Sequence, residues 1–487
     1  MENKIILITY PDSMSKNLYH LKKILCKYLN EVVASVHILP FYPSNSDRGF
    51  SPTTYDSVDE KFGTWEDIKS LSEKFPLLFD YMINHVSSDS KYFKDFKEKK
   101  EKSDYYDMFI KYDDFWPEGI LNENDFDKIY KRKPFPYIDV KYKDGTSDKL
   151  WNTFTNNQID IDFKKQITKD FIKDSLIKLA KKGASIIRLD AVAYTTKKPG
   201  TSCFFVEPDI WEVLEFSKNI LAPYNIEVLP ELHENYTLQK KLSDKGYWVY
   251  DFALPMILLH TLYSGSNKRI IEWLKICPKK QFTTLDTHDG IGVVDVKGIL
   301  SDDEIENTLD LIYTKGVNMK EKYNSVTYNN VDTYQVNCTY YSALGNNDKA
   351  YLLARAIQFF TPGIPQVYYV GLFAGENDID LIEKTKEGRN INRHFYTEKE
   401  IQNELDRSIV QKLFELMRFR NSYHKAFDGE FEILNSDENI VKLSWTNGLL
   451  EAVLEADLIS YDFIITYYND ITKNYEIIDL NNKLKSA

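Results

Sequence analysis

The sequence contains few cysteines, and their spacing matches no disulfide or metal pattern. Only four of the 487 residues are cysteines, namely Cys26, Cys203, Cys277 and Cys338. None belongs to a CxxC pair, so the sequence predicts neither a disulfide scaffold nor a structural zinc site. A reducing cytoplasm fits this composition.

A long apolar segment is missing from the N-terminal region. The first apolar run covers residues 5–10 and is followed by Pro11. This run is too short for the core of a signal peptide or for a membrane-spanning helix. We therefore expect no export, no membrane association and a cytoplasmic location.

The chain also lacks an excess of basic residues and the histidine patterns of common metal enzymes. Its formal net charge is -12, which argues against nucleic acids and anionic membranes as partners, because both attract basic surfaces. No HExxH sequence and no close pair of histidines occurs. We therefore expect no catalytic metal and no cofactor.

What the sequence does contain is a series of short apolar runs that alternate with helical patterns, as in βα units around a parallel sheet. A helix before the fourth run is the clearest, with an expected apolar stripe of Ile167, Phe171, Leu176 and Leu179. Eight strands predict an α/β fold with a closed (β/α)8 barrel. The runs read as strands buried on both faces cover residues 5–10, 32–39, 77–83, 184–190, 226–229, 247–252, 282–286 and 365–370.

Two interruptions of the barrel pattern are too long for ordinary loops and predict inserted modules. One covers residues 85–165 after the third strand, and the other covers 291–346 after the seventh. From residue 426 to 487 the pattern changes to short alternating segments, which predict a small antiparallel β domain. The barrel itself is then assigned to residues 1–84, 166–290 and 347–425.

Three acidic residues lie at the ends of predicted strands. Asp190, Glu231 and Asp289 each end or closely follow an apolar run, and barrel enzymes build their sites at the carboxyl ends of the strands. Cleavage of a glycosidic bond needs one acid and a second carboxylate. Taken singly, each acid is more simply a helix cap or a solvated loop residue, so the prediction of a sugar-active site depends on their convergence.

Aromatic and basic side chains near these loops suit a sugar substrate. Phe50, Phe154 and Tyr194 could stack on the C–H surfaces of a sugar ring. The triplet Lys131, Arg132 and Lys133 is either a solvated charge cluster or a group that attracts phosphate.

Several motifs resemble the α-amylase superfamily and, within it, the sucrose phosphorylase group. Four of them resemble the signature regions of the superfamily: residues 80–85, 187–190, 230–231 and 287–289. Segments that resemble the phosphorylase group are residues 47–52, 205–208, 285–292, 334–345 and 388–394. This similarity runs from the first strand to about residue 425.

The resemblance implies roles for individual residues. Asp190 would be the nucleophile, Glu231 the general acid/base and Asp289 the stabiliser of the transition state, with Arg188 orienting Asp190. Asn84 matches a calcium ligand of many amylases, but the phosphorylase group generally does without that ion. Further residues that the resemblance places around the substrate are Asp47, Phe50, His85, Phe154, Gln158, Tyr194, His288, Asp332, Gln335 and Arg393, with Lys133 and Arg393 as possible phosphate contacts.

The activity that the resemblance implies is the conversion of sucrose and phosphate to α-glucose 1-phosphate and fructose by two displacements at the anomeric carbon. Alternatives with the same acids are phosphorolysis of sucrose 6'-phosphate or glucosylglycerate, and plain hydrolysis. A non-enzymatic partner-binding subunit is disfavoured because all three acids are present. A homodimer is left open.

Overall fold

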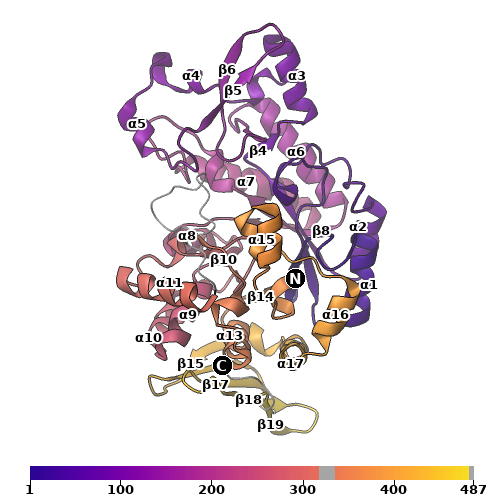
Figure 1. Ribbon diagram of the computed structural model, residues 1–487, viewed down its shortest axis with the longest axis vertical. Coiled ribbons are helices and arrows are strands. Elements are labelled where there is room, and N and C mark those ends of the chain that lie inside the picture. The colour runs from indigo at the N-terminus through magenta and orange to yellow at the C-terminus, as the bar shows by residue number, and fades with distance from the viewer. Residues whose placement is uncertain (317–334, 482–487) are drawn as a thin grey trace. The chain divides into compact units, whose positions relative to one another are not determined.

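The computed structural model describes residues 1–316 and 335–481 of the chain (Figure 1). Its largest sheet has eight strands in the order β10-β11-β14-β1-β2-β3-β8-β9. The recorded pairs β1/β14, β10/β11, β11/β14, β3/β8 and β8/β9 are all parallel. The predicted (β/α)8 barrel is therefore confirmed, and each of its eight strands falls on a predicted run: β1 Ile6–Thr9, β2 Ser35–Ile38, β3 Leu77–Met82, β8 Ala184–Asp190, β9 Glu227–Pro230, β10 Val249–Asp251, β11 Gln281–Thr283 and β14 Ile364–Tyr368.

The strands form because their side chains are apolar on both faces. Every residue of β1, β3 and β14 is buried, as expected when helices cover a parallel sheet from outside and side chains fill its interior. Burial of such runs is the main favourable contribution to folding.

Contacts divide the chain into two units, which we describe separately. The first, called here the insert-bearing unit, comprises residues 17–19 and 38–232. Besides β3, β8 and β9, it contains α2 Trp65–Ser72, β4 His85–Ser87, α3 Lys91–Lys99, α4 Tyr112–Phe115, α5 Glu123–Lys128, β5 Tyr137–Lys141, β6 Ser147–Trp151, β7 Gln158–Asp160, α6 Gln166–Lys181 and α7 Asp209–Leu221.

Within the predicted insertion, the strands form two small antiparallel pairs. β4 pairs with β7, so that His85 lies opposite Asp160, and β5 pairs with β6. The domain boundary at residues 85–165 stays a prediction.

Helix α6 shows one difference from the expected pattern. Leu176 and Leu179 are buried as predicted, but Ile167 and Phe171 are only half-buried, and Thr168 and Ile172 are buried in their place. Side chains on a helix lean toward its N-terminus, so the residues that meet a neighbouring surface lie slightly farther along the chain than apolar spacing alone suggests.

The second, called here the C-terminal unit, comprises residues 1–16, 20–37 and 233–487. It holds most of α1 Leu18–Tyr28 and the strands β1, β10, β11 and β14. Its other elements are α8 Tyr236–Asp244, α9 Leu254–Ser264, α10 Lys268–Ile276, β12 Ile291–Gly292, α11 Asp302–Gly316, β13 Gln335–Val336, α12 Tyr340–Ala343, α13 Asp348–Phe360, α14 Tyr369–Leu372, α15 Ile379–Thr385, α16 Glu398–Leu405, α17 Ser408–Ser422, β15 Glu430–Ile433, β16 Ile440–Asn447, β17 Leu450–Asp457, β18 Phe463–Asn469 and β19 Asn474–Asp479.

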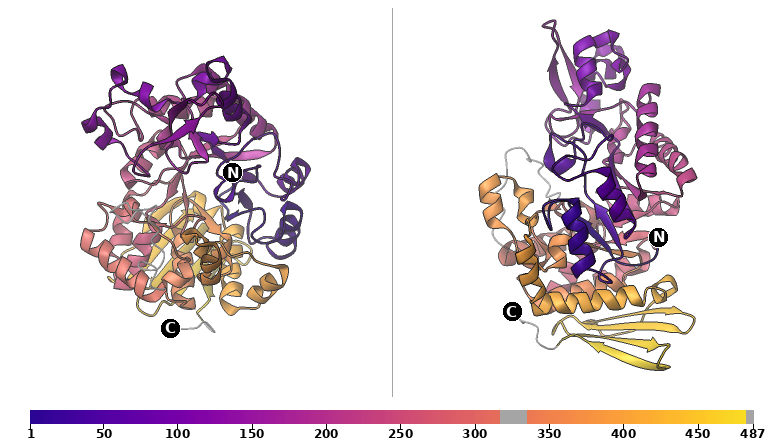
Figure 2. Two further views of the ribbon diagram at one scale, coloured as in Figure 1. Left: turned by 45° about the horizontal axis from the view of Figure 1, so that its top comes forward. Right: turned by 90° about the vertical axis from the view of Figure 1, so that its right-hand side faces the viewer.

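The last five strands form the antiparallel sheet that the sequence predicted. Its order is β15-β16-β17-β18-β19, and Figure 2 shows it as a separate layer beside α17. Helix α13 packs on β16 and β17, and Trp445 on β16 donates its indole N–H to the carbonyl of Phe360 at 2.8 Å. Across residues 1–316 and 335–481, we find no helix with the length and apolar character that a membrane span requires.

Candidate active site

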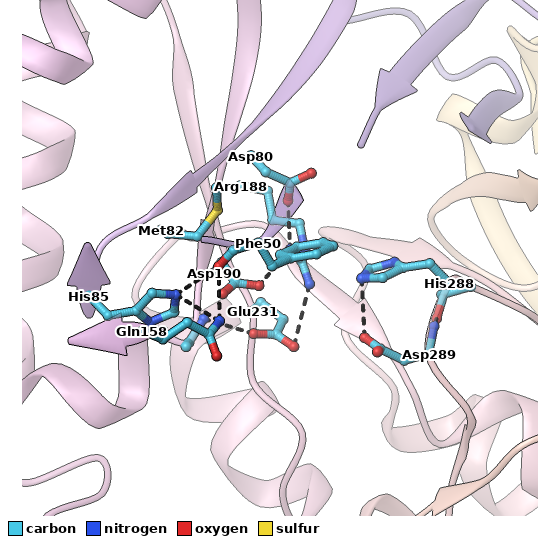
Figure 3. A network of polar contacts seen from close by, with 12 residues as sticks. Phe50, Asp80, Met82, His85, Gln158, Arg188, Asp190, Glu231, His288 and Asp289 are labelled. Atoms are coloured by element: carbon cyan, nitrogen blue, oxygen red, sulfur yellow. Dashed lines mark hydrogen bonds and ion pairs between the residues drawn. The ribbon is translucent and has the colours of Figure 1, made fainter. Parts of the chain in front are cut away.

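The centre of the site in the insert-bearing unit is Arg188 on β8. Its side chain is 3% exposed and contacts three carboxylates (Figure 3). The guanidinium lies 2.6 Å from Asp80 Oδ1, 3.0 Å from Asp190 Oδ1 and 3.4 Å from Glu231 Oε1. One cation therefore gathers two of the predicted catalytic acids and a third, buried acid.

Strand register explains why these groups meet. Asp80 on β3 pairs with Arg188 on β8, and Leu189 on β8 pairs with Pro230 on β9. Glu231 also donates its backbone N–H to the carbonyl of Leu189 at 3.0 Å. Neighbouring strands of a parallel sheet thus deliver all three acids to one region.

The backbone directly after Asp190 is strained. Ala191 has a φ of 54°, which is costly for a residue with a Cβ. In this conformation its N–H donates to Glu231 Oε2 at 2.9 Å. One Glu231 oxygen is held by this N–H and the other by Arg188, so the carboxylate has a fixed orientation.

His85, Gln158 and Phe50 form a second group beside these acids (Figure 3). His85 Nε2 lies 3.0 Å from both the Phe50 carbonyl and Gln158 Nε2. Burial lowers the pKa of His85, which favours the neutral ring. Its Nδ1 is buried without a hydrogen-bond partner among the described residues, so it can serve a bound hydroxyl group.

Aromatic rings extend this group. The His85 and Phe154 rings are 5.8 Å apart and the Phe154 and Tyr194 rings 5.1 Å apart, both edge to face. The Phe50 ring lies 5.9 Å from the Arg188 guanidinium carbon. Rings in this arrangement provide apolar surface next to charged groups, and their contact with a sugar stays a prediction.

Lys197 is a buried residue that sequence reasoning missed. Its side chain is 3% exposed, and Nζ contacts Asn84 Oδ1 at 2.9 Å, Asp160 Oδ2 at 2.8 Å and the Tyr194 carbonyl at 2.5 Å. Burial raises the pKa of Asp160, but Lys197 and the hydrogen bonds from Thr153 together hold that pKa below its usual value. One ammonium group thus joins the segments that carry His85, Gln158 and Tyr194.

We predict that Lys197→Met destabilises the protein by about 3–5 kcal/mol, because it leaves the Asp160 carboxylate buried and unpaired. Urea denaturation measures the free energy of unfolding, and Lys173→Met, at an exposed position on α6, is the control. In wild type, ionised Asp160 contributes stability above the pKa that an aspartate has in the unfolded chain, and this contribution is lost as the pH falls through the lower pKa of Asp160 in the folded protein. The free energies of unfolding of wild type and Lys197→Met should therefore differ less at about pH 4 than at about pH 7. Equal stabilities at neutral pH would contradict this role.

The basic triplet does not act as one cluster. Lys131 turns to the Phe126 carbonyl at 2.9 Å and lies over the Phe126 ring, whereas Lys133 Nζ contacts Asn152 Oδ1. Burial lowers the pKa of Lys133 to about 8, although Asp160 opposes this shift. Of these two lysines, Lys133 is the better candidate for an anion, because it contacts Asn152, whose amide donates to the carbonyl of Gln158.

In the C-terminal unit, the segment after β11 carries His288 and Asp289. His288 Nε2 lies 3.3 Å from Asp289 Oδ2 (Figure 3), and Arg389 Nη1 lies 3.1 Å from Asp289 Oδ1. Burial raises the pKa of Asp289, but His288, Arg389, His233 and Arg393 together hold it well below the usual range. Asp289 is therefore a carboxylate at any working pH.

Arg393 is directed at the backbone of this segment. Its guanidinium is 1% exposed and donates through Nε and Nη2 to the His288 carbonyl at 3.1 and 2.9 Å. Its predicted contact with the substrate stays a prediction.

For the remaining predicted site residues, we report their positions in the chain's secondary structure. Asp47 begins a 3₁₀ turn, Asp47–Gly49, and half-buried Gln335 lies on β13 opposite Gly292. Asp332 lies outside the described residues. Arg389, which sequence reasoning did not single out, lies within the segment 388–394 that carries part of the resemblance.

Comparison with known proteins extends these observations. The family model described as "Alpha amylase, catalytic domain" matches residues 21–412. A sucrose phosphorylase of Streptococcus mutans serotype c is 50% identical over 479 residues, which is 97% of this chain and 99% of that protein. A sucrose 6(F)-phosphate phosphorylase of Thermoanaerobacterium thermosaccharolyticum is 46% identical over 96% of this chain and 98% of its own.

The similarity includes the fold. A crystal structure of sucrose 6F-phosphate phosphorylase from Thermoanaerobacter thermosaccharolyticum matches with a TM-score of 0.93 at 45% identity, and the match covers 98% of this chain and 99% of that one.

Proposed function

Because the chain belongs to the α-amylase family, we propose that it is a retaining glycoside phosphorylase that converts sucrose and phosphate to α-D-glucose 1-phosphate and D-fructose. The 50% identity to a sucrose phosphorylase supports the substrate. The observation that carries the mechanism is the pair Asp190 and Glu231 on one buried guanidinium. Two carboxylates held this close suit retention, in which one attacks the sugar directly.

In the first step, an Asp190 oxygen attacks the anomeric carbon while the bond to the fructose oxygen breaks. Glu231, in its acid form, gives its proton to that oxygen, and a β-glucosyl ester of Asp190 remains. Arg188 orients Asp190 through the contact of its guanidinium with Asp190 Oδ1.

In the second step, the Glu231 carboxylate takes a proton from phosphate, whose oxygen attacks the anomeric carbon and displaces Asp190. The two inversions together give α-D-glucose 1-phosphate. Asp289, fixed as an anion, would stabilise positive charge on the sugar ring in both steps without forming a bond. No metal or cofactor takes part in this scheme.

His85 and His288 are proposed to bind the glucosyl hydroxyl groups, and Asp47 and Arg393 are proposed to close the pocket at the far side of the glucose. Phe50, Phe154, Gln158, Tyr194, Asp332 and Gln335 are proposed to shape the glucosyl and acceptor sites. A cytoplasmic location is supported by the four free cysteines. A homodimer stays an untested prediction.

We predict that Asp190→Ala abolishes sucrose phosphorolysis with unfolding temperature nearly unchanged. Glu231→Gln should reduce turnover of sucrose by about 10²–10⁴-fold, and less for α-glucosyl fluoride, whose leaving group needs no proton. Glu306→Gln, on the exposed side of α11, is the matched control. Near-normal turnover by the Asp190 variant would overturn the assignment.

A second prediction concerns the acceptor. With phosphate at millimolar concentration, glucose 1-phosphate should exceed free glucose, which chromatography of the products measures. If Lys133 binds phosphate, KM for phosphate should rise as the pH passes about 8, because the lysine loses its charge there. Lys133→Arg should keep KM low to higher pH, since a guanidinium stays charged. Free glucose as the main product would identify a hydrolase.

A third prediction concerns the leaving group. We expect higher kcat/KM on sucrose than on sucrose 6'-phosphate, because a phosphorylated sugar needs two or more aimed cationic contacts. Of the two lysines of the basic triplet, Lys131 is directed at Phe126, and Lys133 contacts Asn152 next to Gln158. The 46% identity to a sucrose 6(F)-phosphate phosphorylase makes this the alternative to test. A tenfold preference for the phosphorylated sugar, about 1.4 kcal/mol in transition-state binding, would replace sucrose by its phosphate as the substrate.

A further inference from the structure

One short segment of the C-terminal unit binds several polar groups of the Asp289 turn, which comprises residues 287–289. Asn392 Nδ2 donates to the carbonyls of Thr287 and Asp289, both at 3.1 Å. Arg393 donates to the His288 carbonyl, and Arg389 contacts the Asp289 carboxylate. We call residues 389–393 the clamp segment.

Local geometry explains how the clamp segment does this. Residues 388–392 form a 3₁₀ helix, in which side chains three residues apart lie on the same face. Arg389 and Asn392 therefore both face the Asp289 turn. Ile391 is fully buried, and its carbonyl accepts from the Asp378 N–H at 2.8 Å, which anchors the segment independently of any ligand.

Arg389 differs from the other members of the clamp segment. Asn392 and Arg393 are 2% and 1% exposed, and their recorded hydrogen bonds to the turn go to its carbonyls. The Arg389 side chain is 31% exposed and contacts a carboxylate. Removing Arg389 therefore leaves the recorded hydrogen bonds to all three turn carbonyls in place. Its contribution can be separated from folding of the turn.

The two oxygens of Asp289 have different recorded partners. Oδ2 lies near His288 Nε2 and Oδ1 near Arg389 Nη1. In the proposed function His288 also binds a sugar hydroxyl group. Arg389 is not needed for that task, and a guanidinium stays charged at every working pH.

We propose that Arg389 is a positioning residue that fixes the orientation of the Asp289 carboxylate for charge stabilisation in the transition state. The proposal rests on the proposed function of Asp289. A preoriented charge avoids reorganisation during the reaction. Loss of Arg389 should therefore reduce kcat strongly and weaken substrate binding only slightly. If the contact is only a surface ion pair, its loss changes neither quantity appreciably.

The test compares wild type with Arg389→Ala, Arg389→Gln, Arg389→Lys and Asp289→Asn, with the exposed α15 residue Lys384→Ala as control. Formation of glucose 1-phosphate gives kcat and KM for sucrose, and circular dichroism checks folding of each variant. Activity of Arg389→Ala is also measured with added guanidinium chloride or with sodium chloride at the same ionic strength, in amounts below those that unfold the protein. The double variant with Asp289→Asn completes a cycle.

We expect Arg389→Ala and Arg389→Gln to lose on the order of 10- to 100-fold in kcat, as for a misplaced catalytic group, with KM for sucrose changed less than about twofold. Arg389→Lys should retain more activity than either. Guanidinium ions, but not sodium ions, should restore part of the activity of Arg389→Ala. In the Asp289→Asn background, the Arg389 change should reduce kcat only slightly.

Three results would overturn the proposal: wild-type kcat in the folded Arg389→Ala or Arg389→Gln variant, losses that multiply in the double variant, or equal effects of the two salts. If Asp289→Asn itself keeps near-normal activity, the proposed function of Asp289 fails, and the positioning role of Arg389 fails with it. If Arg389→Ala has reduced activity and Asp289→Asn is inactive, both the proposed function of Asp289 and the positioning role of Arg389 are supported.

Discussion

The site in the insert-bearing unit depends on one buried cation shared among three carboxylates. Arg188 lies on β8 between the strands that carry Asp80 and precede Glu231, and its guanidinium contacts all three acids within 3.4 Å. Buried carboxylates repel each other and lose hydration, so they remain together only with a cation among them. The remaining local charge is negative, which suits a reaction in which positive charge develops on a sugar ring.

Two further cations complete the arrangement, each within its own unit. Lys197 ties together the segments of Asn84, Asp160 and Tyr194 in the insert-bearing unit. Arg389 contacts the carboxylate of Asp289 in the C-terminal unit. Side chains that we propose to bind or react with the substrate are thus oriented by neighbouring basic residues.

The sequence predicted the eight barrel strands because continuous apolar runs leave little choice for a strand buried on both faces. It also marked Asp190 and Glu231, since both sit where such runs stop. It could not reveal Lys197, because this lysine becomes informative only when the fold brings it to Asp160 and to Asn84, which lies 113 residues earlier in the chain. Likewise, the basic triplet looked like one cluster, but Lys131 and Lys133 contact different neighbours. Pairings between distant polar residues arise from tertiary structure and carry no local periodicity.

The central claim is that Asp190 forms a covalent bond to glucose, and mass spectrometry of proteolytic peptides tests it most directly. The Glu231→Gln variant is mixed with α-glucosyl fluoride in the absence of phosphate, so that the first step can proceed and the second is slowed. The account predicts that the peptide containing Asp190 gains the mass of one glucosyl unit, located on Asp190 by fragmentation, and that added azide, which needs no base, releases it. A glucosyl group on a different residue, or turnover of the fluoride with no adduct and with inverted configuration of the product, would contradict the account.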